Sequence, residues 1–191
     1  MKALRQENQG YTYADFITWD EDVRYELIDG EAYLLAAPNV AHQRISGELH
    51  GQIWQFLKGK PCEVFHAALD VRLNADEDDN TVLEPDIVVV CDRSKLAGGK
   101  ACVGAPDMVA EILSPSTAGR DCILKLEKYQ KAGVREYWIV DPESRSVGVH
   151  VWDNGKTVFH AYEETDTVPV HVLEGCAISL PDVFGPLKIE D

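Results

Sequence analysis

The feature that most constrains the fold is an apolar run, Ile87 to Cys91, that has no polar residue at alternate positions. A strand with one face in water alternates apolar and polar residues, whereas a strand covered on both faces does not. A second run, Met108 to Leu113, is interrupted only by Glu111, and a third core strand is expected at Glu136 to Val140. The sequence therefore predicts a sheet whose central strands are covered on both faces.

Helices and hairpins surround these strands along the chain. Apolar residues at spacings of three and four predict one helix from Asn39 to about Leu57 and another from about Gly119 to Ala132. The dipeptides Asp29-Gly30 and Asn154-Gly155 are typical of two-residue hairpin turns. A short helix and two further strands are expected at Thr12 to Asp20, Glu63 to Phe65 and Leu69 to Leu73. The predicted fold class is α/β, a mixed β-sheet flanked by helices with extra N- and C-terminal β-hairpins.

The length of 191 residues fits one domain. We expect a single domain over 1–191, with a core at about 11–152 and a C-terminal β extension at about 153–191. No apolar stretch approaches the roughly 18 residues of a membrane span, and no hydrophobic signal region is present, so we expect a cytoplasmic protein without membrane contact. The five cysteines contain no CxxC pair, which favours reduced thiols over a disulfide framework or a structural zinc.

The charge is distributed unevenly. The 18 Lys and Arg residues against 33 Asp and Glu residues give a net charge of −15, which repels nucleic acid if it is spread evenly. Between Arg93 and Arg135, eight basic residues stand against four acidic ones, so this stretch carries +4 and the remainder −19. The stretch is either a solvated helix surface or a surface that binds a polyanion.

Two carboxylates fall within or beside the predicted core strands. Asp86 directly precedes Ile87, and Glu111 lies inside the second apolar run. Burying a carboxylate costs several kcal/mol unless a partner or a metal compensates it. Each has a structural alternative, because Asp86 can cap the turn after Pro85 and Glu111 can pair with a basic side chain. Taken together, and followed by a lysine-bearing helix, the two acids favour a functional site.

The arrangement of a proline-aspartate before one core strand and an acid within the next resembles the PD-(D/E)XK nuclease superfamily. Within it, the chain resembles the Uma-type restriction endonuclease family. The matching segments are YELIDGE at 25–31, AAPNVAHQ at 36–43, EPDIVVV at 84–90 and GAPDMVAEILSPSTAGRDCILKLEKYQKAGVREYWIVDP at 104–142. The resemblance extends from Tyr11 to about Trp152.

This resemblance implies that the mixed β-sheet is restriction endonuclease-like. It also implies a metal-dependent endonuclease that hydrolyses DNA phosphodiester bonds. It implies Mg²⁺, or Mn²⁺, held by Asp86, Glu111 and the backbone carbonyl of Ile112, a ligand set that suits a hard cation. Glu26 matches the N-terminal acidic position of the family, although an outward-pointing charge in a hairpin explains it as well. DNA is the expected substrate and a homodimer the expected assembly, with the C-terminal hairpin either decorating the sheet or forming the interface.

The lysine of the superfamily motif, two residues after the acid, is replaced here by Leu113. Lys125 in the following helix is the matching position in this branch. The alternative role for Lys125 is an (i, i+4) ion pair with Asp121, which contributes only about 0.2 to 0.5 kcal/mol to stability. Tyr129 lies four residues further on the same helix face, where it contacts substrate or orients Lys125.

Four further residues are candidates for binding substrate or a phosphate group. Ser116, Thr117 and Arg120 are expected near a helix N-terminus, where free backbone amides bind phosphate, with ordinary helix capping as the alternative for the first two. His42 falls in one of the matching segments and is otherwise a polar residue satisfied by its neighbours.

Two other functions are compatible with these residues. The first is a catalytically inactive nuclease-fold module for binding or assembly, which the net charge of −15 favours and the retained acid-acid-lysine set disfavours. The second is a carboxylate-pair hydrolase of a neutral substrate, which needs neither a metal nor a basic surface.

Overall fold

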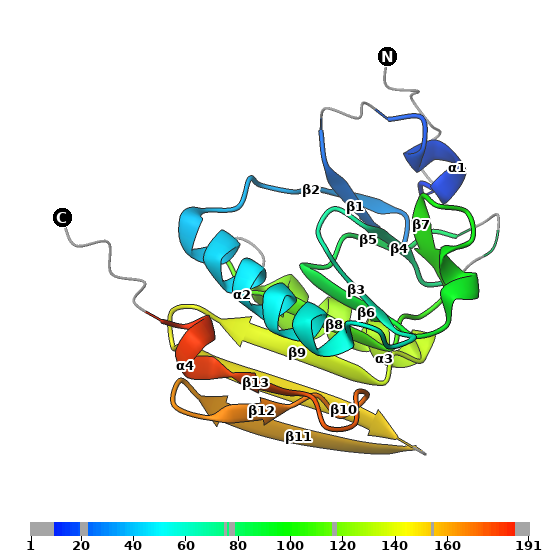
Figure 1. Ribbon diagram of the computed structural model, residues 1–191. Coiled ribbons are helices and arrows are strands. Elements are labelled where there is room, and N and C mark those ends of the chain that lie inside the picture. Colours follow the sequence, from blue (N-terminus) through cyan, green and yellow to red (C-terminus); the bar gives the residue numbers. More distant parts are fainter. Residues whose placement is uncertain are drawn as a thin grey trace.

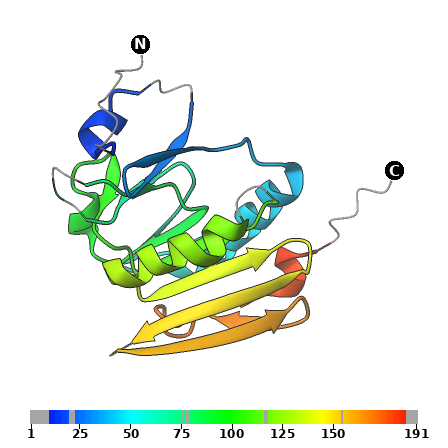
Figure 2. The ribbon, with the colours of Figure 1, turned by 180° about the vertical axis from the view of Figure 1, so that it is seen from behind.

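The computed structural model describes residues 10–19, 23–74, 76, 79–115, 118–153 and 155–185. Within these ranges a six-stranded and a five-stranded mixed sheet pack against each other (Figure 1). The two views show α2 and α3 on opposite faces of the six-stranded sheet (Figures 1 and 2). The predicted α/β class, a mixed sheet flanked by helices with hairpins toward both ends of the chain, is confirmed.

The six-stranded sheet has the order β11-β10-β9-β8-β6-β3, in which only β8 and β9 are parallel neighbours. Its strands are β3 (Glu63–His66), β6 (Ile87–Val90), β8 (Met108–Ile112), β9 (Glu136–Asp141), β10 (Ser146–Asp153) and β11 (Lys156–Glu163). All residues of β6 and β8 are buried, as the missing polar alternation predicts. Their side chains divide between two clusters: Ile87 and Val89 pack with α2, whereas Val88 and Val90 pack toward the other sheet.

The five-stranded sheet has the order β2-β1-β5-β4-β7. Its strands are β1 (Tyr25–Ile28), β2 (Glu31–Leu34), β4 (Asp70–Arg72), β5 (Val82–Leu83) and β7 (Ala101–Val103). The predicted β1-β2 hairpin is confirmed, and both turn residues have positive φ, 51° at Asp29 and 81° at Gly30, as a tight hairpin turn requires. β5 and β7 were not predicted, since strands of two and three residues are too short to show a period.

The helices are α1 (Tyr13–Phe16), α2 (Val40–Leu57), the 3₁₀ turn η1 (Arg93–Leu96), the π-helix η2 (Arg120–Lys125), α3 (Leu126–Ala132) and α4 (Leu180–Val183). Asn39 caps α2 by accepting a hydrogen bond from the backbone N–H of His42. Gly133, at φ 93°, ends α3 as predicted. The expected single regular helix from about Gly119 to Ala132 is instead a π-helix followed by an α-helix. No helix among the described residues is long and apolar enough to span a bilayer.

The C-terminal segment packs into the same core as α2. It forms the hairpin β12 (Thr167–Pro169) and β13 (Ala177–Ser179), followed by α4. Ile178, Leu180 and Phe184 belong to the buried cluster that contains Ile45 and Leu49 of α2. The buried carboxylate of Glu136 also holds this segment, because it accepts hydrogen bonds from Trp138 Nε1 (2.7 Å) and from the backbone N–H of Val172 (2.8 Å). The expected division into a core and a C-terminal extension stays a prediction.

The cysteines correct the sequence-based expectation. Cys62 and Cys91 form a disulfide, whereas Cys102, Cys122 and Cys176 are free. The expectation of reduced thiols was wrong for this pair because spacing along the chain does not reveal cross-strand partners. In the β3-β6 ladder Glu63 lies opposite Val90, which brings the two flanking cysteines together.

Replacing Gly30 by alanine is expected to lower the free energy of unfolding by about 2 kcal/mol or more. A Cβ at Gly30 would lie 2.8 Å from the Cα of Gly10. The positive φ of Gly30 also disfavours residues other than glycine. The control is Gly47→Ala in α2, where nothing lies within 4 Å of the added Cβ, and which should raise stability by about 0.5 to 1 kcal/mol. Urea unfolding followed by tryptophan fluorescence measures both, and equal effects would contradict this account of the hairpin.

Candidate active site

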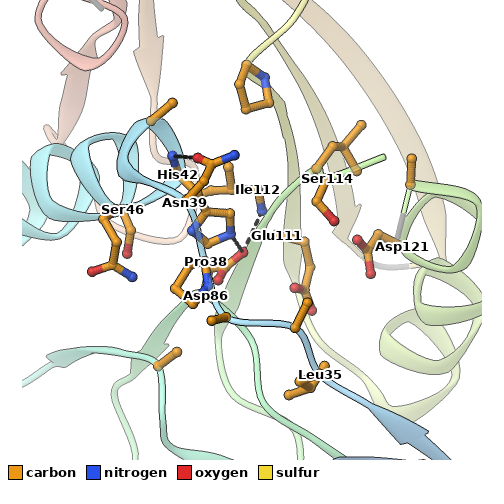
Figure 3. Close-up of a pocket in the computed structure, with 18 of the residues that line it drawn as sticks. Leu35, Pro38, Asn39, His42, Ser46, Asp86, Glu111, Ile112, Ser114 and Asp121 are labelled. Carbon is orange, nitrogen blue, oxygen red and sulfur yellow. Dashed lines mark hydrogen bonds and ion pairs between the residues drawn. The ribbon is translucent and has the colours of Figure 1, made fainter. Parts of the chain in front are cut away.

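A cavity of about 510 Å³ opens where the carboxyl ends of β8 and β9 face the N-terminus of α2 (Figure 3). Among the charged groups of its lining, carboxylates are the most numerous: Glu26, Glu84, Asp86, Glu111, Asp121, Asp141 and Glu143. The lining also contains two strongly basic side chains, Arg24 and Lys125, and the imidazoles of His42 and His66. The cavity is therefore strongly negative in the absence of bound cations.

Asp86 and Glu111 reach this cavity because of strand alternation. Ala110 and Ile112 pack toward α2, so Glu111 between them points to the opposite face of β8. Asp86 directly precedes β6, and its Oδ2 accepts a hydrogen bond from the backbone N–H of Ile112 at 2.8 Å. The same oxygen lies 3.2 Å from Nε2 of His42 in the first turn of α2 (Figure 3).

The ammonium of Lys125 lies among three carboxylates. Its Nζ is 2.8 Å from Oε1 of Glu26, 2.9 Å from Oε1 of Glu111 and 3.2 Å from Oδ1 of Asp121. The side chain of Lys125 is only 4% exposed. Burial by itself lowers the pKa of Lys125, but the three carboxylates raise it by more, so the net pKa is above its ordinary value and the lysine stays charged.

Glu111 occupies the centre of the hydrogen-bond network. Its Oε1 accepts hydrogen bonds from Lys125 Nζ and from the hydroxyl of Tyr129 at 2.8 Å. Burial raises the pKa of Glu111 well above its ordinary value; Lys125 opposes that shift, and the acids Asp121, Glu26 and Asp86 add to it. Burial likewise raises the pKa of Tyr129, so its phenol remains a hydrogen-bond donor.

Glu26 is wholly buried and links the N-terminal hairpin to this network. Its Oε1 accepts hydrogen bonds from the backbone N–H of Glu84 and from Lys125. Its Oε2 lies 3.5 Å from the guanidinium of Arg120 and accepts no hydrogen bond from a described residue. Arg120 stacks on the ring of Tyr33, 4.4 Å from its centroid, and so fastens the hairpin to the π-helix.

The structure brings most of the predicted site residues together in two adjoining groups. Glu26, Glu111, Arg120, Lys125 and Tyr129 form one group, and His42, Asp86 and Ile112 form the other. Tyr129 is fully buried behind Glu111 and does not line the cavity. Ser116 and Thr117 lie outside the described residues.

Most basic residues of the stretch are paired with acids, some within the stretch and three, Glu26, Asp29 and Glu63, from elsewhere in the fold. Six of its eight basic residues are ion-paired: Arg93 with Glu63, Arg120 with Glu26, Lys125 as above, Lys128 with Asp29, Lys131 with Glu127 and Arg135 with Asp107. A surface for polyanions on this stretch stays a prediction.

Sequence reasoning did not place three further groups in the site. Asp121 was considered only as a surface partner of Lys125, yet it is 3% exposed and shares Lys125 with Glu26 and Glu111. Arg24 and Glu84 form an ion pair at the cavity, and His66 also lines it. The position of Asp121 four residues before Lys125 was the available signal.

The donor atoms at the cavity suit a hard divalent cation. Asp86 and Glu111 supply carboxylate oxygens, and Mg²⁺ binds through one or two carboxylates with water completing its shell. Among the described residues, none donates a hydrogen bond to Oε2 of Glu111, so this atom is available as a ligand. Within the described ranges, no group of three or more His, Cys, Asp or Glu side chains is already arranged around one metal position.

The fold and the cavity define a restriction endonuclease-like protein, and comparison with known families agrees. Residues 13–181 match the model of the Uma2 family, whose description is "Putative restriction endonuclease". The chain belongs to this family.

Two relatives illustrate the range of the likeness. An uncharacterized protein of Synechocystis sp. PCC 6803 is 27% identical over 134 residues, which cover 68% of this chain and 74% of that protein. The crystal structure of a "putative nuclease belonging to DUF820" from Anabaena variabilis superposes with a TM-score of 0.75 at 22% identity, covering 91% of this chain and 97% of that one. At that identity the second likeness concerns the fold alone.

In the metal-free protein, Glu111→Gln is expected to increase the free energy of unfolding by an amount that grows from pH 5 to pH 9. The pKa of Glu111 is higher in the folded than in the unfolded state. The contribution of Glu111 to the free energy of unfolding is therefore fully present below the unfolded pKa of about 4.3 and is lost as pH rises through the folded pKa. Glutamine stays neutral and keeps an oxygen for Lys125. Urea unfolding in EDTA at several pH values measures the difference.

Glu127→Gln is the control for this measurement, because Glu127 is exposed on α3 and its hydrogen bond with Lys131 lowers its pKa. Its substitution should not stabilise the protein at any pH. An effect of Glu111→Gln that is the same at pH 5 and pH 9 would show that burial of this carboxyl is not costly.

Proposed function

We propose that this protein is a metal-dependent endonuclease of the PD-(D/E)XK type that hydrolyses phosphodiester bonds in DNA. The observation that carries the proposal is the convergence of Asp86, Glu111 and Lys125, from three separate segments of the chain, on one cavity. Membership of the Uma2 family supports a nuclease.

Asp86, Glu111 and the backbone carbonyl of Ile112 would hold Mg²⁺ or Mn²⁺. When bound, the ion supplies a water of lowered pKa and neutralises charge on the attacked phosphate. The protein prepares these ligands: the N–H of Ile112 and the imidazole of His42 fix one oxygen of Asp86, and the hydroxyl of Tyr129 fixes one oxygen of Glu111.

Lys125 is proposed to steady the attacked phosphate or the nucleophilic water. Its ammonium is held at the cavity before substrate arrives, and one of its three carboxylate contacts has to be exchanged for the phosphate or the water. Charge that develops on the phosphate in the transition state is then stabilised more than the ground state.

The charge of the cavity bears on how DNA would enter it. Both strongly basic lining residues are engaged, Arg24 with Glu84 and Lys125 with its three acids. A polyanion therefore meets mainly carboxylates, and we propose that divalent cations must bind before or with DNA. Binding should be weak and sensitive to salt.

The pairing of Lys125 with three carboxylates also favours a second candidate, an inactive binding or assembly module. A lysine that is saturated by Glu26, Glu111 and Asp121 is also what a structural ion cluster contains. The two candidates differ in cation binding and turnover, which the following experiments measure.

Titration calorimetry with Mn²⁺ and with Mg²⁺ tests the metal site. The parent protein is expected to bind the cation, and Asp86→Ala is expected to weaken binding at least about tenfold by removing one of two ligand carboxylates. Glu174→Ala, at an exposed acid away from the cavity, should bind as the parent does. If the parent takes up no cation, the metal-dependent mechanism is wrong.

Lys125→Met is expected to lower the rate of plasmid cleavage by roughly 10² to 10³-fold, as the loss of one preorganised electrostatic donor does. Cation binding should persist, because lysine is not a ligand. Circular dichroism establishes whether Lys125→Met is folded. If it is not, the cleavage rate is measured with Lys125→Arg, which keeps a cation beside the three carboxylates.

Lys128→Met is the matched control on the same helical segment. Lys128 pairs with Asp29 in the hairpin turn, away from Glu111, so its loss should change DNA affinity and salt dependence more than turnover. Equal losses in both variants, or full cleavage by Lys125→Met, would remove Lys125 from the mechanism.

A further inference from the structure

The phenol of Tyr137 is hydrogen-bonded to the backbone of the π-helix that carries Lys125. Tyr137 lies in β9 and is fully buried. Its hydroxyl donates a hydrogen bond to the backbone carbonyl of Asp121 at 3.0 Å. Asp121 and Lys125 both belong to η2 and both line the cavity. This hydrogen bond therefore ties the segment that supplies the lysine to the central sheet, where the light-green helical segment lies beside the yellow strand β9 in Figure 2.

Strand alternation places the ring of Tyr137 on the same face of the sheet as Glu111. The parallel strands β8 and β9 pair with Val109 opposite Tyr137 and Glu111 opposite Ile139. Residues two apart on a strand, and partners across a ladder, point to the same face. Val109 and Tyr137 belong to the buried cluster that also contains Tyr129 of α3. Tyr137 therefore reaches η2 from the centre of the sheet, where neighbouring strands hold its backbone on both sides.

Two stacked tyrosines support different parts of the candidate active site. The ring centroids of Tyr129 and Tyr137 are 4.9 Å apart. The hydroxyl of Tyr129 donates to the carboxylate of Glu111, a candidate metal ligand, whereas that of Tyr137 donates to the backbone of Asp121. Burial raises the pKa of Tyr137 well above its ordinary value, and the nearby acids add to that shift, so its phenol remains a hydrogen-bond donor. The two hydroxyls can therefore be tested separately.

The π-helix is the part of the site that most needs support from outside. Hydrogen bonds of the i→i+5 kind are rare in proteins and occur mostly as single turns, frequently at functional sites. In η2 the carboxylate of Asp121 lies 3.2 Å from Nζ of Lys125, four residues further along. A displacement of the backbone at Asp121 would therefore move both a carboxylate beside the ammonium and the turn from which the lysine extends.

We propose that Tyr137 is a positioning residue for Lys125: by holding the carbonyl of Asp121, it fixes the turn of η2 that directs the ammonium to the cavity. Tyr137 does not line the cavity, so it acts through Lys125 and not by touching substrate. The consequence for DNA cleavage rests on the proposed function, whereas the effect on Lys125 itself does not.

Chemical modification of Lys125 tests the proposal without any activity measurement. Tyr137→Phe removes only the hydroxyl and keeps the packing of the ring. In this variant Lys125 should react with acetic anhydride roughly fivefold faster or more than in the parent, because loss of the hydrogen bond favours local opening of η2. Mass spectrometry of proteolytic peptides at a low extent of modification measures this rate relative to Lys131, an exposed lysine of α3.

Two controls separate a local effect from a general loss of stability. Tyr162→Phe removes the hydroxyl of a partly buried tyrosine of β11 that does not line the cavity, and its Lys125 should react as in the parent. Hydrogen exchange of the backbone amides of α2 should be the same in Tyr137→Phe and in the parent, whereas exchange in η2 should be faster.

Turnover supplies a second test. If the protein cleaves DNA, Tyr137→Phe should lower kcat by roughly tenfold to a hundredfold, as misplacement of a positioned group does, and leave KM and Mn²⁺ affinity within about twofold. In the Lys125→Met background the same substitution should change kcat by less than about twofold, because residues that act through one group are not additive. A merely structural residue would lower kcat equally in both backgrounds.

The outcomes distinguish this proposal from the proposed function. If Lys125 reacts as slowly in Tyr137→Phe as in the parent, the positioning role is wrong, whether or not the protein cleaves DNA. Equal losses of kcat in the two backgrounds, or a loss of Mn²⁺ affinity that matches the loss of kcat, would also overturn it, the latter by placing the effect at Glu111. A parent protein that does not cleave DNA would contradict the proposed function alone, and the reactivity of Lys125 would still decide the role of Tyr137.

Discussion

The contact on which the site depends is the enclosure of the Lys125 ammonium by the carboxylates of Glu26, Glu111 and Asp121. These acids come from the N-terminal hairpin, the central strand β8 and the π-helix, so one cation holds three elements together. A charge removed from water costs several kcal/mol unless its partners are well placed, and here all three lie within 3.2 Å. The cluster still contains more negative than positive charge around Lys125. That imbalance is the physical reason to expect a divalent cation at the adjoining carboxylates.

The parts of the fold that could be predicted are those with a strong periodic or local signal. β6 and β8 lack polar alternation, α2 has apolar residues at helical spacing, and Asp29-Gly30 marks a turn that only a few residue types can adopt. The strands β5 and β7 could not be predicted, because a strand of two or three residues is defined by its neighbours in the sheet. The Cys62–Cys91 pair depends on the β3-β6 register, which no spacing along the chain encodes.

The site was predictable to the extent that burial makes a charge conspicuous. Asp86 and Glu111 stood out because one directly precedes an apolar strand and the other interrupts one, and the resemblance to a family added Glu26 and Lys125. The environment of Lys125 could not be predicted, since the wide turn of η2 that directs both Asp121 and Lys125 inward has no clear sequence signal. A local count of charge also failed to show that Arg93 and Lys128 are paired, because their partners Glu63 and Asp29 lie outside the counted stretch.

The disulfide has a consequence for the wall of the cavity. β3 is an edge strand, and an edge strand that slips by one residue turns every side chain to the opposite face. The covalent link between Cys62 and Cys91 anchors one end of the β3-β6 ladder, and the hydrogen bond from the N–H of Ala67 to the carbonyl of Asp86 anchors the other. With both ends fastened, the ladder cannot shift its alignment without breaking a bond. A shift that moves His66 relative to Asp86 therefore has to break one of these links.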